Sequence, residues 1–116
     1  MYDNNIIANK SKKFAVRVVK LGKYLREEQK EYVLSKQIVR SGTSIGANVR
    51  EALQAQTRKE FASKMNIALK EASETEYWLE ILFESEMLTN EQFQSMKTDC
   101  SELNKILISI VKNTKL

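Results

Sequence analysis

Four basic residues recur at intervals of three and four near the start of the chain, namely Lys10, Lys13, Arg17 and Lys20. On an α-helix this spacing places the charges in one stripe. If four to six basic side chains here touch phosphates, the logarithm of affinity falls with the logarithm of salt with a slope of about −4 to −5. Two other interpretations stay open, a solvated helix face or a face neutralised by acidic helix residues 58–87. No aromatic residue except Tyr24 lies near the stripe, so base stacking is not expected.

The charge of the chain is unevenly distributed along its length. The net charge is +4, but residues 1–58 carry 12 Lys or Arg against 5 Asp or Glu, whereas residues 59–116 carry 7 against 10. Such asymmetry indicates a polyanionic partner for the basic half, or contact between basic and acidic helices or subunits.

Three polar residues fall on faces that the hydrophobic pattern assigns to a core, namely Ser41, Asn48 and Glu76. A buried carboxylate without hydrogen-bond donors costs several kcal/mol, whereas one that accepts hydrogen bonds is tolerated and fixes the register between helices. We expect these three side chains to meet or to find local partners. A structural polar network is expected in preference to a catalytic carboxylate, because purely structural networks also perturb ionisable groups.

Other enzyme chemistry finds little support in the composition. The chain has no histidine, which excludes histidine metal sites and His-based triads, so no metal or cofactor is expected. The single cysteine, Cys100, lies on an apolar stripe and is expected to be a small core residue. We therefore predict a protein that is not an enzyme. The lack of a signal-peptide core and of any apolar run near 18 residues predicts a cytoplasmic protein outside the membrane.

The elements that must position these residues are amphipathic helices. Apolar residues at alternating intervals of three and four predict helices over about 10–28, 31–55, 58–87 and 90–113. Short connections make neighbouring helices antiparallel, so we predict one all-α domain over residues 1–116, an up-down-up-down four-helix bundle. Residues 1–9 and the last few are expected to be disordered.

Two helix starts carry an additional sequence pattern. Thr57 is followed three residues later by Glu60, and Thr89 is followed in the same way by Gln92. A Thr three residues before a Glu or Gln is typical of a capping box, in which each side chain accepts a hydrogen bond from the backbone of the other residue.

The stretch "RSGTSIGANVREA", residues 40–52, holds two of the three glycines. The apolar period passes through it without a break in phase, which predicts helix. Gly42 and Gly46 lie one helical turn apart, and each costs about 1 kcal/mol relative to alanine inside a helix. We expect the close approach of a neighbouring helix to offset that cost.

The second half carries more apolar residues than one core stripe for each helix needs. Those outside the stripes are Tyr77, Trp78, Ile81, Leu82, Ile106, Ile108 and Val111. An excess of this kind indicates contact between subunits. We predict a homo-oligomer with Tyr77, Trp78 and Ile81 in its interface.

Two segments, "YVLSKQIVRSGTSIGANVREA" and "KEFASKMNIALKEASETEYWLEIL", resemble a known family over roughly residues 10–112. This family comprises the four-helix-bundle proteins encoded in intervening sequences of bacterial 23S ribosomal RNA genes. The chain departs from its pattern at Arg50, Ala52 and Ala72, where relatives have small residues or glycine. Its matching positions are Ser41, Thr43, Ser44, Ile45, Asn48, Glu51, Phe61, Ala68, Ser73 and Glu76.

The resemblance implies a bacterial, cytoplasmic ring of five bundles, a homopentamer, whose basic surface binds RNA or DNA. A similar bundle is the accessory protein of diversity-generating retroelements, which implies a reverse transcriptase as a protein partner. We thus expect a non-enzymatic, nucleic-acid-binding homo-oligomer. The main alternative is a protein-interaction or scaffold bundle, and a weaker one is a carboxylate-based hydrolase centred on Glu76.

Overall fold

The computed structural model describes residues 4–114, and the all-α prediction is confirmed. The helices are α1 (Asn4–Glu27), α2 (Leu34–Leu53), α3 (Arg58–Glu84) and α4 (Asn90–Asn113). Within residues 4–114, each helix packs against its two neighbours around the bundle, whereas no Cα atom of α1 lies within 8 Å of α3, and none of α2 lies within 8 Å of α4. The fold is therefore an antiparallel up-down-up-down bundle, elongated to 44 × 20 × 20 Å.

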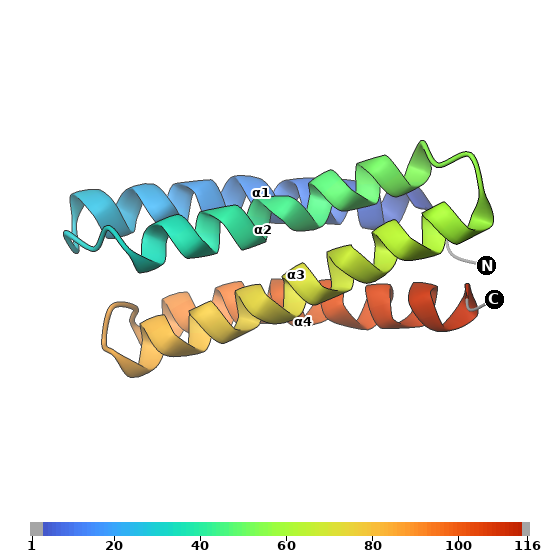
Figure 1. The fold of residues 1–116 in the computed structure, drawn as a ribbon. Helices are drawn as coiled ribbons and strands as arrows, with labels where there is room; N and C mark the ends of the chain where they lie inside the picture. The colour runs from blue at the N-terminus through green and yellow to red at the C-terminus, as the bar shows by residue number, and fades with distance from the viewer. Residues whose placement is uncertain (1–3, 115–116) are drawn as a thin grey trace.

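The bundle consists of two helical hairpins stacked in two layers. Figure 1 shows α1 and α2 together in one layer and α3 and α4 in the other. The α1–α2 and α3–α4 connections lie at one end, and the α2–α3 connection lies at the other end with both termini. In the part of the chain that the structure describes, no helix is both long and apolar enough to cross a membrane.

Helix α1 begins six residues earlier than the sequence pattern predicts. Ile7 is fully buried, and with Ser11, Phe14 and Val18 it continues the alternating spacing of four and three toward the N-terminus. The prediction of disorder over residues 1–9 is therefore wrong for residues 4–9, and residues 1–3 lie outside the described residues.

The helix starts use three different caps. At α4 both hydrogen bonds of the predicted Thr89–Gln92 box are present. At α3 Thr57 accepts from the Glu60 backbone at 3.0 Å, but the Glu60 carboxylate accepts from the backbone of Gln56 at 3.4 Å, so the predicted box is only half formed.

The cap of α2 is a carboxylate that the sequence pattern places inside the helix. Glu31 precedes α2 and accepts backbone N–H bonds from Val33, Leu34 and Ser35 at 3.2, 3.0 and 2.8 Å. A negative charge here satisfies otherwise unpaired N–H groups and interacts favourably with the helix dipole. Helix α2 therefore begins at Leu34 and not near residue 31.

The serine- and glycine-rich stretch is continuous helix, as predicted, and its glycines face α1. A methyl group added at Gly42 would meet Val18 at 2.7 Å, and one at Gly46 would meet Ser11 at 3.3 Å. Gly22 of α1 faces Val39 of α2 in the same way, at 2.4 Å. The glycines thus let the α1 and α2 backbones come close together.

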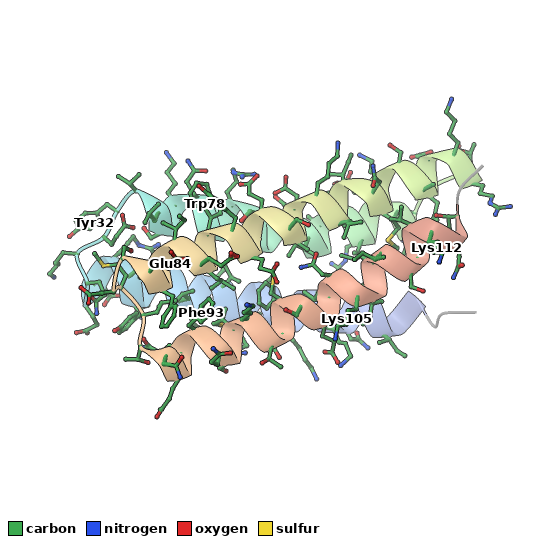
Figure 2. All side chains as sticks on the ribbon, turned by 90° about the horizontal axis from the view of Figure 1, so that it is seen from below. Tyr32, Trp78, Glu84, Phe93, Lys105 and Lys112 are labelled. Carbon is green, nitrogen blue, oxygen red and sulfur yellow. The ribbon has the colours of Figure 1, made fainter. Side chains whose placement is uncertain are left out.

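In α1 and α4 the buried residues recur at the predicted intervals of three and four, whereas the buried face of α3 includes one residue that the sequence pattern places outside it. The fully buried α3 residues are Met65, Ala68, Ala72, Thr75, Leu79 and Leu82. Leu82, which the sequence analysis places outside the core stripe, is fully buried, so that prediction is wrong. Phe83 is only partly buried. Its ring stacks on that of Phe93 of α4 (Figure 2), and the two ring centroids are 4.4 Å apart.

Candidate nucleic-acid interface

The four cations predicted to form one phosphate-binding stripe fall into two groups. The Lys10 ammonium lies 3.1 Å from the carboxylate of Glu102, and Arg17 lies 2.5 Å from that of Asp99. Lys13 and Lys20 are exposed, and neither has an ion-pair partner among residues 4–114. Half of the predicted stripe is thus engaged within the bundle.

Arg17 is held by more than its ion pair. One guanidinium nitrogen donates to the Ser95 hydroxyl at 2.7 Å, and the other donates to the Ser95 carbonyl at 3.3 Å as well as to Asp99. These contacts join α1 to α4 at their shared edge. Because they fix a planar group through several donors, they position Arg17 more firmly than one contact positions Lys10.

The carboxylates that pair with the basic stripe come from α4 and not from α3. Helix α3 lies diagonally across the bundle from α1, and its Glu71 and Glu74 pair with Arg40 of α2. The alternative interpretation, in which residues 58–87 of the same chain neutralise the basic stripe, is therefore wrong, because bundle topology separates the two helices. Charge compensation occurs between neighbours around the bundle.

The two layers of the bundle differ in charge. Helices α1 and α2 together carry ten Lys or Arg and two Glu, whereas α3 and α4 carry seven Lys or Arg and nine Asp or Glu. The sequence analysis locates this asymmetry between the halves of the chain, and the fold converts it into one basic face. Exposed cations of this basic layer without an ion-pair partner among residues 4–114 are Lys12, Lys13, Lys20, Arg26, Lys36 and Arg50.

A groove on the basic layer is a feature that the sequence analysis does not identify. It lies between α1 and α2, and its volume is about 540 Å³. Small residues form most of it, with two cations among them, and its lining is Ala8, Lys12, Ala15, Thr43, Gly46, Ala47, Arg50, Leu53 and Gln54. No acidic side chain lines it. The sequence signal for this groove is the small size of residues that share a helix face, namely Ala8 and Ala15 on α1 and Gly46 on α2.

The predicted polar residues do not form one network. Ser41 lies in the core, where its hydroxyl is 2.9 Å from that of Thr75. Asn48 donates to the Ser44 carbonyl of its own helix at 2.8 Å. Glu76 is only partly buried and accepts from Ser101 of α4 at 3.2 Å. The placement of Glu76 in the core is therefore wrong, and Thr75 occupies that position.

The three residues predicted to form a subunit interface differ in exposure. Tyr77 is 55% exposed, and Ile81 is partly buried. Trp78 packs against the core, and its indole N–H donates to Glu74 at 3.0 Å (Figure 2). Trp78 thus has a role inside the subunit, and Tyr77 is the most accessible of the three.

The remaining candidate group for chemistry is the thiol of Cys100. It is fully buried and donates a weak hydrogen bond to the Ala72 carbonyl at 3.4 Å. Burial, with smaller contributions from Glu76 and Asp99, raises the pKa of this thiol to about 12. Such a thiol is a poor nucleophile near neutral pH. Among residues 4–114, no three His, Cys, Asp or Glu side chains group closely enough to hold a metal ion.

Comparisons with known proteins give the same overall picture. Residues 3–109 match the 23S rRNA-intervening sequence protein family. A crystal structure of a protein of unknown function from the S23 ribosomal protein family of Bacteroides thetaiotaomicron superimposes with a TM-score of 0.92. The two chains are 61% identical over 94% of this chain and 97% of the other. No curated protein matches this chain at a significant level.

Proposed function

Because the chain belongs to the 23S rRNA-intervening sequence protein family, we propose that it is a non-enzymatic, homo-oligomeric bundle that binds nucleic acid. The observation that carries the proposal is the concentration of ten Lys or Arg against two Glu in the layer formed by α1 and α2. A mainly basic face attracts phosphates through counterion release, which acts on RNA and DNA without regard to sequence. The protein's place in a bacterial cytoplasm is part of the proposal.

The phosphate contacts are assigned to the unpaired cations of the basic layer. These include Lys13 and Lys20 of the original stripe and add Lys12 and Arg50 beside the groove. No aromatic side chain lines the groove beside Lys12 and Arg50, so the contacts read backbone charge and not base identity. We therefore expect little sequence specificity.

The test measures binding to a labelled DNA duplex and to structured RNA from about 50 to 200 mM salt. The test variant changes Lys12, Lys13, Lys20 and Arg50 to Gln. Each lost phosphate contact is expected to make the salt slope shallower by about 0.9 for duplex DNA, and affinity should fall. Absence of binding by the wild type at the lowest salt would remove the proposal.

A matched control separates local contact from net charge. It changes four exposed lysines of the other layer to Gln, namely Lys59, Lys70, Lys105 and Lys112. Both variants lose four charges, so a general effect of net charge would weaken binding equally. The proposal expects the control to keep a salt slope close to that of the wild type.

Oligomerisation is proposed on the outer face of α3. Tyr77 and Ile67 are 55% and 37% exposed there, and Ile81 lies on the same face. The family resemblance implies a ring of five subunits, which would multiply weak phosphate contacts. Light scattering tests this with Tyr77→Ser and Ile81→Ser, because Trp78 substitutions would also disturb the core. A monomeric wild type at micromolar concentration would contradict the proposal.

A second candidate function is a protein-interaction bundle, and the groove between α1 and α2 favours it. Small side chains allow a partner helix to approach closely, while Lys12 and Arg50 would pair with acidic residues on that helix. A reverse transcriptase is the partner implied by the resemblance to retroelement accessory proteins. This function predicts that the wild type binds no nucleic acid. It also predicts that Ala47→Trp, which would fill the groove, abolishes binding of the partner.

A further inference from the structure

Two cations of α1 have ion-pair partners on α4, at the edge where these two helices meet. Lys10 contacts Glu102, and Arg17 contacts Asp99. We infer that Asp99 and Glu102 are internal competitors of phosphate, which hold Arg17 and Lys10 in the bundle and keep them from a nucleic-acid backbone. This inference rests on the proposed function, and it identifies residues that limit the strength and the position of binding.

The N–H groups of Arg17 donate to oxygens of α4, as they would donate to the oxygens of a phosphate. Its guanidinium contacts an Asp99 oxygen at 2.5 Å and the hydroxyl and carbonyl of Ser95 at 2.7 and 3.3 Å. Oxygens arranged around a planar guanidinium reproduce the geometry of phosphate recognition. A phosphate that takes the place of Asp99 at Arg17 gains a contact only after the ion pair with Asp99 is lost.

Further carboxylate charge lies along the same edge. Glu91 lines a groove between α1 and α4 with Arg17 and Lys20, and Asp99 and Glu102 line a second one with Lys10 and Lys13. A phosphate backbone placed along this edge would thus meet three carboxylates. Like charges at short range oppose binding.

The outer face of the basic layer has the opposite character. The groove between α1 and α2 has Lys12 and Arg50 in its lining and no acidic side chain. Both helices carry only one Glu each, at Glu27 and Glu51. The carboxylates of α4 therefore weaken phosphate contacts at the α1–α4 edge, those of Lys13 and Lys20 included, relative to contacts on this outer face.

The competition is open to displacement because the pairs are partly exposed. The side chains of Arg17 and Asp99 are 39% and 44% exposed, and those of Lys10 and Glu102 are 42% and 52% exposed. Exposed ion pairs are weak and screened by salt. Removing the carboxylates should therefore free both cations without unfolding the bundle.

The experiment compares the full chain with an Asp99→Asn/Glu102→Gln variant, using a labelled DNA duplex of mixed sequence over the same salt range. The inference expects roughly ten-fold tighter binding at low salt, since two competing pairs are lost. It also expects the salt slope to steepen by about 1 to 2, because each new phosphate contact adds about 0.9. Thermal unfolding verifies that both proteins are folded at the titration temperature.

Two further variants identify the cause of any change. Glu84→Gln/Glu86→Gln removes the same charge from two exposed residues, one at the end of α3 and one in the α3–α4 connection, and should tighten binding only slightly. Adding Lys10→Gln/Arg17→Gln to the Asp99→Asn/Glu102→Gln variant should return the slope to the wild-type value. The Lys10→Gln/Arg17→Gln change alone should leave the wild-type slope nearly unaltered, because those cations are already engaged.

The outcomes separate this inference from the proposed function. Binding by the wild type with equal responses of the Asp99/Glu102 and Glu84/Glu86 variants would overturn the inference and leave the proposed function standing. Tighter binding with an unchanged slope would also overturn it, because removal of the carboxylates would then have added no phosphate contact. Binding by the Asp99/Glu102 variant alone would support the competition by these carboxylates but remove the proposed function of the wild type, and absence of binding by every protein would overturn both.

Discussion

A methyl group added at Gly42 of α2 would lie 2.7 Å from Cγ1 of Val18 on α1, and Cγ2 and Cβ of Val18 lie within 3.0 Å of the same point. Three atoms of one β-branched side chain surround the position, so a rotation of Val18 cannot relieve the overlap. The α1–α2 contact is therefore closed to any side chain larger than hydrogen at this residue.

We predict that Gly42→Ala lowers the free energy of unfolding by up to about 2 kcal/mol. Overpacking costs about 1–3 kcal/mol, and a gain of about 1 kcal/mol in helix propensity offsets only part of that cost. Urea unfolding measures the change. In a Val18→Ala background the same substitution should become neutral or stabilising, and a wild-type protein stabilised by Gly42→Ala would contradict the close packing.

The buried Ser41–Thr75 contact leads to a second prediction. Thr75→Val should lower the free energy of unfolding by about 1–3 kcal/mol, because it leaves the buried Ser41 hydroxyl with only a weak local acceptor. That acceptor is the Ile38 carbonyl at 3.4 Å. Thermal or urea unfolding of Thr75→Val, Ser41→Ala and the double variant should give a double-variant loss smaller than the sum of the single losses.

Glu76→Gln provides the control for the Thr75 prediction. Glu76 is only partly buried and contacts Ser101 at the α3–α4 edge, so its effect on unfolding should stay within about 0.5 kcal/mol. A Glu76 variant that costs more than Thr75→Val would mean that the hydrophobic pattern, and not the structure, assigns the core residue correctly.

The contrast between Thr75 and Glu76 indicates how far sequence reasoning extends. Spacing locates the helices and the seams of α1 and α4, because their apolar residues repeat without ambiguity. In α3, Thr75 and Glu76 lie three and four residues after the buried Ala72, so both satisfy the period. Only contact with Ser41 of α2 distinguishes them, and one-dimensional spacing does not contain that contact.

The candidate interface was predictable in charge but not in pairing. The excess of Lys and Arg in the first half is visible in the sequence, and the bundle topology makes α3 a diagonal neighbour of α1. The pairing of Arg17 with Asp99 also requires the relative axial position and rotation of α1 and α4. Those depend on the close α1–α2 packing at Gly22, Gly42 and Gly46, which propensity rules do not specify.

The end of α3 gives a third prediction. Glu86 has a positive φ of 65°, and the hydrogen bonds from Met87 to Leu82 and from Glu86 to Phe83 at 2.8 and 3.0 Å close the helix around it. Glycine adopts this left-handed conformation without steric cost. Glu86→Gly should therefore raise the free energy of unfolding by about 0.5–1 kcal/mol, measured as a higher midpoint of thermal unfolding.

A neighbouring glycine substitution is the control for Glu86→Gly. Ser85 has a φ of −88°, so it gains nothing from glycine, and Ser85→Gly should lower the unfolding midpoint. Equal destabilisation by both substitutions would show that flexibility, and not the left-handed backbone, determines the result.

The buried thiol of Cys100 gives the fourth prediction, which concerns alkaline pH. Its pKa is raised to about 12 in the folded protein, whereas an unfolded thiol has a pKa of about 8.5. As pH rises above the lower value, the unfolded state loses this proton first, so deprotonation favours unfolding. The contribution of Cys100 to stability is thus complete below about pH 8.5 and falls, by up to about 1.4 kcal/mol per pH unit, as the pH approaches the folded pKa.

Cys100→Ala isolates this effect from the lysines and tyrosines that titrate in the same range. Urea unfolding of both proteins between about pH 8 and 10.5 should give a difference in unfolding free energy that shrinks as pH rises, because only the wild type carries the thiol. The same burial predicts that a disulfide reagent modifies Cys100 slowly in the folded protein and rapidly in urea, since the thiolate is the reactive form. A pH-independent difference combined with rapid modification of the folded chain would mean that the thiol is accessible, and the packing of α4 against Ala72 would then be looser than the 3.4 Å contact requires.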